Sequence, residues 1–512
     1  MLSKASNNLL AYALKDIKEN RNYYIFLLIV LAICFILFHF ISAHDDIIYY
    51  VNEMNFINEV KNRIISESRF FYPIIVEIVN QLYLSYKVVL LFGFVLFYVN
   101  NFILIKLFFP NITKISWLFL SLLLIVNPFN IFLMYWSTMF FTIQLGIFIT
   151  SYSYYVFTHT NLNIYLKVLV SALAIFAALN LMPVVFYIYI TILFLSIFCE
   201  FLLDNKVTFK QIIKDKYLHV VYILLGILIF YTINKFLLFY LNAEQQYGGW
   251  RGEYIPIDSL SLLFARIKSV FFTLKHMPIY FYSIVILNTM LLIYSIIKKR
   301  TYFLSILIFI CIFILMFISY ISDILINIHG TNVRLNSIHY LFAILFMISL
   351  NVFNKYLVKI LYVVLSIYIL ISISLIDRFF DANKIIERVN TYIYDKIELE
   401  ALKLSSKVGT KIYVYGYNNQ IFSLYNKREV DLFRFFSYFP DFKTWANHYE
   451  VNALVKNIGY SNVEILYNNN IDLELRNIIE SKTQKDIIFP KEGSIFEYNG
   501  NIYVIFNKIN DK

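Results

Sequence analysis

Long apolar runs follow one another through the first 376 residues, and they constrain the fold more than any other feature. A helix needs about 20 largely apolar residues to cross a bilayer. Candidate spans lie at 22–42, 88–108, 218–241, 279–297, 302–326, 338–352 and 356–376. Two longer runs, 115–157 and 165–203, are each long enough for two spans and carry breaks at Asn127–Asn130 and Asn180–Pro183. Splitting both predicts an α-helical polytopic membrane protein with about 11 transmembrane helices.

Composition supports this class. The chain is 60% hydrophobic and 15% charged, against roughly 45–50% and ~25% in soluble domains, so the apolar excess must face lipid. Residues 1–376 carry 26 basic and 15 acidic residues, whereas 377–512 carry 18 of each. The net charge of +11 therefore lies in the apolar part, where it is a topology signal and not a nucleic-acid footprint. These numbers exclude a soluble enzyme, a disulfide scaffold and a disordered chain.

The distribution of short basic loops predicts the orientation. With a cytoplasmic N-terminus, the cytoplasmic side collects every short basic loop, as the positive-inside rule requires. Its basic residues are Lys4, Lys15, Lys18, Arg21, Lys114, those between 206 and 216, Lys298, Lys299, Arg300, Lys355 and Lys359. The outer side then holds loops at 43–87, 242–278 and 327–337 and the C-terminal tail. The first apolar run lacks a cleavage site and is interpreted as a retained helix.

The outer segments have structure of their own in this prediction. Residues 47–83 and 258–275 have amphipathic or short apolar patterns, which are typical of helices lying in the membrane interface. Residues 377–512 predict a small extracytoplasmic α/β domain. It has a helix to about residue 406, strands at 411–417 and 463–467, a helix near 441–457 and a hairpin at Asn499-Gly500. No catalytic motif occurs in it, and a structural or docking role is the simpler interpretation.

The most specific local feature is His44-Asp45-Asp46, directly after the first span. Adjacent carboxylates raise at least one pKa unless a cation or an acceptor proton compensates, which suits a general base or a metal ligand. Simple solvation at a helix end is the alternative. A metal site built from His44, Asp45 and Asp46 alone is a weaker hypothesis, because three consecutive residues rarely suffice. The cysteines Cys34, Cys199 and Cys311 lie in apolar runs and form no metal motif.

Two outer arginines are candidates for binding phosphate. Arg69 opens the apolar segment RFFYPIIVEIVNQLY, and Arg334 is the basic residue of the short loop before the tenth span. Arginine favours bidentate phosphate binding. The alternatives are snorkelling for Arg69 and helix-end anchoring for Arg334. Glu77 lies in the same segment as Arg69, too far for a one-turn helical pair.

The loop QQYGGWRGEYIP at 245–256 concentrates three of the 12 glycines around Trp250, Arg251 and Glu253. Glycine permits a mobile loop, tryptophan stacks on sugar faces, and Arg251 and Glu253 supply polar contacts. The loop predicts a substrate-binding lid, with an aromatic interface anchor as the alternative.

Together these features resemble the C-type glycosyltransferases, and within them the Gtr-type bacterial glucosyltransferases that modify surface polysaccharides. The resemblance depends on AHDDIIYY at 43–50, SRFFYPIIVEIV at 68–79, LLLIVNPFNIFLMYWS at 122–137 and the passage from the last span into 377–417. One departure is that no arginine follows the acidic pair between Ile47 and Asn55, which shifts phosphate binding to Arg69.

The resemblance implies an inverting transfer of a hexose, glucose by that likeness, on the outer face of the bacterial cytoplasmic membrane. The donor would be a polyprenyl-phosphate sugar and the acceptor a cell-surface glycan such as O-antigen. Asp45 would be the general base, with Asp46 as its orienting or metal-binding neighbour. The resemblance implies either that the reaction requires no cofactor or that a divalent cation assists it.

Three other classes stay open from the sequence. A polysaccharide polymerase or ligase would more often carry its large soluble part between helices than as a tail. A transporter of lipid-linked glycan would need ionisable residues or broken helices at the midplane. A non-catalytic scaffold would not require the His44-Asp45-Asp46 cluster.

Overall fold

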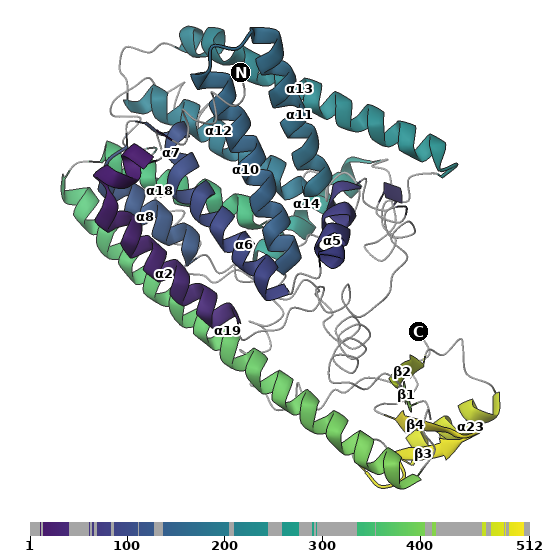
Figure 1. The fold of residues 1–512 in the computed structure, drawn as a ribbon. Helices are drawn as coiled ribbons and strands as arrows, with labels where there is room; N and C mark the ends of the chain where they lie inside the picture. The colour runs from purple at the N-terminus through teal and green to yellow at the C-terminus, as the bar shows by residue number, and fades with distance from the viewer. Residues whose placement is uncertain are drawn as a thin grey trace. The chain divides into compact units, whose positions relative to one another are not determined.

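The computed structural model describes the chain in separate stretches, and most of the described residues are helical (Figure 1). The described residues are 11, 14–39, 61, 64–65, 69–82, 86–110, 112–126, 137–203, 209–243, 259–275, 289–290, 293, 335–353, 355–404, 412–415, 463–466, 473–485, 487 and 491–505. By contacts the chain divides into two compact units. One comprises residues 1–40 and 54–376, and the other comprises 41–53 and 377–512.

Among the described residues, six helical stretches are long and apolar enough to cross a membrane. They are Lys87–Phe108, Thr138–His159, Ile164–Leu181, Pro183–Glu200, Lys216–Tyr240 and Lys355–Ser374. Three shorter apolar helices, Arg21–Ile33, Lys114–Ile125 and His339–Asn351, coincide with three further predicted spans. The predicted spans 279–297 and 302–326 lie almost entirely outside the described residues. A multi-pass helical membrane protein is therefore what the structure supports, and the count of eleven stays a prediction.

The helices of the first unit pack as a bundle. It contains α2 (Arg21–His39), α5 (Phe71–Gln81), α6 (Tyr86–Tyr98), the π-helix η1 (Val99–Leu104), α7 (Ile105–Phe108), α8 (Lys114–Ile125), α10 (Ser137–His159), α11 (Ile164–Leu181), α12 (Pro183–Leu203), α13 (Phe209–Tyr240), α14 (Leu260–Lys275) and α18 (Leu335–Val352). Near the centre, α10 packs against α6, α11 and α12 (Figure 1). On its flanks, α13 packs on α11, and α18 packs on both α12 and α8.

Local sequence signals explain where several of these helices begin and end. The Asn163 side chain caps α11 by accepting a hydrogen bond from the Tyr165 backbone N–H at 3.0 Å. Met182 then leaves the helical conformation (φ −158°, ψ 121°), and Pro183 opens α12 at the first helical position, where its missing N–H costs nothing. The run 165–203 is thus two helices, as its break predicts.

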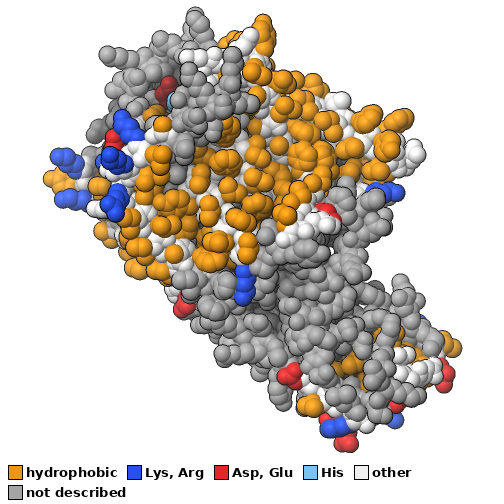
Figure 2. All heavy atoms as spheres, viewed as in Figure 1, with side chains coloured by type: hydrophobic (Ala, Val, Ile, Leu, Met, Phe, Trp, Pro, Cys, Tyr) orange, Lys and Arg blue, Asp and Glu red, His pale blue; other side chains and the backbone are white. Residues whose placement is uncertain are grey.

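Large apolar side chains remain exposed on the outside of the bundle. On α13 they include Leu224, Leu228, Tyr231 and Phe236, each at least 58% exposed. Figure 2 shows a broad apolar surface on one face of the bundle, with lysine and arginine at its margin. A patch of this extent is far larger than soluble monomers tolerate and is the surface expected in contact with lipid.

The helix α19 (Lys355–Leu404) contributes residues to both units. In the second unit, β1 (Ile412–Tyr415), β2 (Val463–Leu466), β3 (Ile495–Tyr498) and β4 (Asn501–Ile505) form one sheet in the order β2-β1-β4-β3. The β1 strand pairs in parallel with β2 and β4, and β3 pairs antiparallel with β4. Asn499 and Gly500 both have positive φ, so the predicted hairpin turn is confirmed.

The helix α23 (Leu473–Gln484), which the sequence analysis did not anticipate, packs Leu475 and Ile479 against Tyr503 and Ile505 of this sheet. The predicted helix near 441–457 lies outside the described residues. The predicted interfacial segments 47–83 and 258–275 contain the helices α5 and α14, respectively. Their placement at a membrane interface stays a prediction.

The contact between α11 and α13 predicts a measurable sensitivity at Gly226. A Cβ at this position would lie 2.7 Å from both the Ala172 carbonyl oxygen and the Ile175 Cβ. Gly226→Ala should therefore force the two helices apart and lower the free energy of unfolding by about 1–3 kcal/mol. Thermal unfolding of the detergent-solubilised protein measures this effect.

Val220→Ala on the same helix is the matched control, because Val220 is 57% exposed on the outer face. Equal melting temperatures for Gly226→Ala and Val220→Ala would contradict the close packing of α11 on α13.

Candidate functional site

Arg69 is the candidate site residue that the structure describes. Of the others, His44, Asp45, Asp46, Trp250, Arg251, Glu253 and Arg334 lie outside the described residues. Their proximity to one another and to Arg69 therefore stays a prediction. Among the residues that are described, no group of three histidines, cysteines, aspartates or glutamates could hold a metal ion, and the possible divalent site at Asp45 and Asp46 is likewise a prediction.

The Arg69 side chain is enclosed by protein and is 5% exposed. Its guanidinium Nη1 contacts the Sδ atom of Met182, and its Cζ lies 5.9 Å from the centroid of the Tyr72 ring. A snorkelling arginine would keep its guanidinium in water. The buried position instead favours an arginine that is held at a defined place inside the bundle.

Aromatic packing fixes the segment that carries Arg69. The rings of Phe70 and Phe71 lie 6.0 Å and 5.7 Å from the ring of Phe176 on α11. Tyr72, Val76 and Val79 of α5 are buried. Arg69 is thereby held at the junction between α11 and α12, which contains the predicted break Asn180–Pro183. Arg69 and Met182, which lie 113 residues apart in the sequence, are in contact at this junction.

The α11–α12 junction also contains a buried hydrogen-bond acceptor. The Asn180 amide donates to the Phe176 carbonyl at 3.0 Å, while its Oδ1 atom has no hydrogen-bond partner in the described part of the chain. Glu77 lies in α5 and accepts a hydrogen bond from the Gln81 side-chain amide of the same helix at 2.7 Å. The Glu77 carboxylate therefore has a hydrogen-bond partner on its own helix.

Two adjacent asparagines make buried hydrogen bonds inside the bundle, and sequence reasoning missed them. Asn100 and Asn101 lie in the π-helix η1, a type of distortion that is frequent at functional sites. The Asn100 amide donates to the Gln144 carbonyl at 2.7 Å, and the Tyr340 hydroxyl donates to Asn101 Oδ1 at 2.8 Å. The sequence signal that could have predicted these polar contacts is the pair of adjacent asparagines inside the apolar run 88–108.

The helices α8 and α18 are joined at both ends. The Thr113 backbone N–H donates to Asn351 Oδ1 at 3.2 Å, and His339 Nε2 donates to the Leu123 carbonyl at 2.9 Å. The 12 residues of α8 rise about 18 Å, which is less than the ~30 Å hydrocarbon core. The described helix α8 therefore ends within the thickness of a bilayer.

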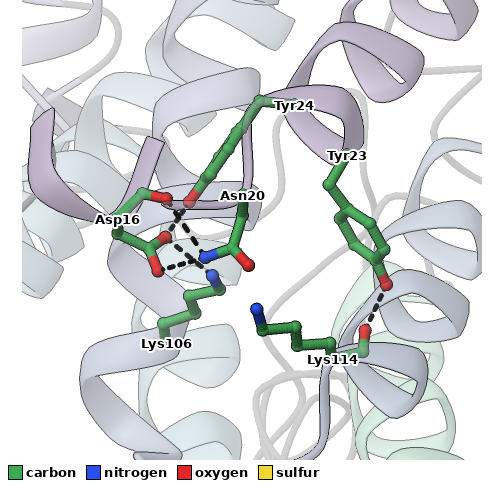
Figure 3. Close-up of polar contacts among 6 residues, drawn as sticks. All are labelled: Asp16, Asn20, Tyr23, Tyr24, Lys106 and Lys114. Atoms are coloured by element: carbon green, nitrogen blue, oxygen red, sulfur yellow. Dashed lines mark hydrogen bonds and ion pairs between the residues drawn. The ribbon is translucent and has the colours of Figure 1, made fainter. Parts of the chain in front are cut away.

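A second polar cluster lies where the chain's first helical residues meet the end of α7 and the start of α8 (Figure 3). The Lys106 ammonium is 2.7 Å from Asp16 Oδ2, and these two side chains are 18% and 19% exposed. Asp16 also accepts hydrogen bonds from the Asn20 amide, at 2.9 Å, and from the Tyr24 hydroxyl. The same ammonium lies 3.7 Å from the centroid of the Trp117 ring, a cation–π contact.

The two polar regions agree with the predicted sidedness of the chain. Asp16, which precedes the first predicted span, meets Lys106 near the predicted cytoplasmic end of the span 88–108. The Tyr23 hydroxyl, at the start of the predicted span 22–42, donates to the carbonyl of Lys114, a residue assigned to the cytoplasmic side. Arg69 and Met182, both assigned to the outer side, also meet. Which of the two sides faces the cytoplasm stays a prediction.

No protein-family model matches this chain, and the searches of curated proteins and of solved structures found no match either.

The Asp16–Lys106 pair predicts a coupling in stability. Asp16→Asn should lower the free energy of unfolding by about 1–3 kcal/mol, because it leaves a half-buried ammonium without its anion. Adding Lys106→Met should restore part of that loss, so that the double variant is more stable than the sum of the two single changes implies. Thermal unfolding in detergent measures all three variants.

Glu19→Gln is the control, since the Glu19 carboxylate faces Lys15 at 4.0 Å in an exposed pair that contributes little. Strictly additive effects of Asp16→Asn and Lys106→Met would show that the pair does not act as a unit.

Proposed function

We propose that this chain is an integral-membrane glycosyltransferase that uses a polyprenyl-phosphate sugar. It would transfer a hexose, glucose by family likeness, to a cell-surface glycan on the outer face of the bacterial cytoplasmic membrane. The multi-pass helical bundle supplies the membrane setting that such a donor requires. The substrate class follows from the resemblance of its sequence motifs to the C-type glycosyltransferases.

The observation that carries the proposal is the burial of Arg69 at the α11–α12 junction. A charge inside a membrane protein is costly and commonly marks a substrate path. A polyprenyl phosphate keeps its hydrocarbon tail in lipid and its phosphate at headgroup level. An arginine held within the bundle beside a helix break is suited to a bidentate contact with that phosphate.

The proposed reaction needs one base. The acceptor hydroxyl oxygen attacks the anomeric carbon and forms the new glycosidic bond, while the bond from that carbon to the phosphate oxygen breaks. The hydroxyl proton passes to the Asp45 carboxylate, and the bond electrons leave with the polyprenyl phosphate. This product is stable as an anion, so the leaving group needs no acid. Asp46 would orient Asp45 or hold a divalent cation.

Transport of a lipid-linked glycan is the second candidate, and one observation favours it. The helix α8, with 12 residues, is shorter than a bilayer-spanning helix, and interrupted helices frequently line transport sites. A transporter would move the lipid-linked sugar without breaking its bond to phosphate. The products of the reaction therefore distinguish the two functions. A polysaccharide polymerase or ligase would also break that bond, but it would use a lipid-linked oligosaccharide as donor.

The test is an assay of sugar transfer from radiolabelled polyprenyl-phosphate hexoses to purified surface glycan, with and without EDTA. Asp45→Asn should lower kcat by about 10²–10⁴-fold, the usual contribution of a general base. Arg69→Lys should raise KM for the donor by about tenfold, since lysine cannot make the bidentate contact. Loss of activity in EDTA would establish the divalent cation.

Asp377→Asn is the control for Asp45→Asn, because Asp377 is an exposed carboxylate that follows the last apolar run. Wild-type turnover by Asp45→Asn would exclude Asp45 as the base. If the wild type consumed no monosaccharide donor and transferred no sugar, the transport and polymerase functions would take precedence.

A further inference from the structure

The Asp16–Lys106 cluster forms one wall of a cavity that the proposed transferase reaction does not use. The cavity has a volume of about 220 Å³. It is lined by Asp16, Glu19, Asn20, Ile105, Lys106, Phe109, Pro110, Ile112, Lys114, Trp117, Leu120 and Met347. Pockets that bury drug-sized ligands measure about 300–1,000 Å³, so this one matches a small polar group better than a whole nucleotide sugar.

The charges around the cavity are unequally satisfied. Both carboxylate oxygens of Asp16 have partners in the protein, and Lys106 is paired with one of them. Lys114 has no carboxylate within ion-pair distance among the described residues, and its charge interacts with that of Lys106. Figure 3 shows the Lys114 side chain extending toward the Lys106 ammonium. Glu19 is the second carboxylate of the lining, but it faces Lys15 at 4.0 Å. Among the described residues Lys114 is therefore the lining ammonium without a carboxylate partner, and an anion would complete its pairing.

The start of α8 adds to this positive field. Lys114 is its first residue, and no acidic residue occurs in its first turn. The N-terminus of a helix carries a partial positive charge, which normally favours an acidic residue there and makes a lysine unfavourable. An anion beside Lys114 would balance both the ammonium and the helix end, as phosphates do at other helix N-termini.

The remaining walls indicate what kind of anion would fit. Apolar side chains from four parts of the bundle, including Ile105, Leu120 and Met347, line the cavity beside its charged wall, and Ile115 next to Lys114 is 54% exposed. A polar group that enters here would have apolar surface beside it. Glu19 also lines the cavity, and its negative charge disfavours a phosphate with two charges over one with a single charge.

We propose that this cavity binds the phosphodiester of a membrane phospholipid headgroup, with Lys114 contacting a phosphate oxygen. Lys106, held in place by Asp16 and Trp117, supplies the fixed positive charge behind it. The acyl chains lie along the apolar side chains at the end of the bundle. This site is separate from Arg69, and the proposal does not depend on the transferase function.

The experiment measures lipid binding to the delipidated full chain in detergent by native mass spectrometry. Short-chain phosphatidylglycerol is the probe, diacylglycerol with the same chains lacks the phosphate, and glycerophosphoglycerol keeps the singly charged phosphodiester but lacks the chains. Wild-type protein should bind phosphatidylglycerol saturably and tighter than either comparison ligand. Lys114→Gln should raise the dissociation constant for phosphatidylglycerol about tenfold, the value of one charge-assisted hydrogen bond.

Lys18→Gln is the matched control. Lys18 is an exposed lysine in the same helical turns as Asp16, but it does not line the cavity, so the dissociation constant should stay within about twofold of wild type. Equal binding by Lys114→Gln and Lys18→Gln would overturn the site. Binding of glycerophosphoglycerol as tight as that of the lipid would overturn the lipid assignment in favour of a soluble phosphate ester.

Discussion

A bilayer interior offers no hydrogen-bond partner to backbone amides and no solvation to charges, and this constraint governs the whole first unit. Helices satisfy their own backbone groups, so each apolar run folds as a helix wherever the structure describes it. The exposed leucines and aromatic residues of α13 form the surface that we expect lipid to cover. Some polar side chains within the bundle have partners in the protein, as Asn101 does with Tyr340 and Asn100 with the Gln144 carbonyl. Others, such as Asn180 through its Oδ1 atom, have a buried polar atom without a partner among the described residues.

The same constraint sorts the ionised groups toward the helix ends. Lys106 reaches Asp16 and the Trp117 ring at one end of its helix, and Arg69 is enclosed at the α11–α12 junction. These two charges belong to different chemistry in our account. We propose that Arg69 binds the phosphate of a sugar donor, and that the cavity beside Lys106 and Lys114 binds a phospholipid headgroup. A membrane enzyme that handles a lipid-linked substrate has use for both.

Sequence patterns predicted the features that arise within a few residues. The break at Met182–Pro183 and the Asn499-Gly500 turn each follow from local backbone preference. The contacts that define the polar regions join distant segments, such as Asp16 with Lys106 over 90 residues and Tyr340 with Asn101 over 239. Periodicity carries no information about such pairs. The helix α23 was missed because its charged residues mask a short apolar stripe at Leu475 and Ile479.

The central claim is that the charged and polar groups of this chain are segregated by a membrane with the N-terminus on its cytoplasmic side. Its most direct test is labelling of single cysteines in intact cells by a membrane-impermeant maleimide, after replacement of Cys34, Cys199 and Cys311. We expect labelling of Asn242→Cys and Glu492→Cys from outside, and of Lys18→Cys and Asn161→Cys only after the membrane is permeabilised. The reverse pattern would contradict the orientation, and labelling of all four from outside would contradict the segregation itself.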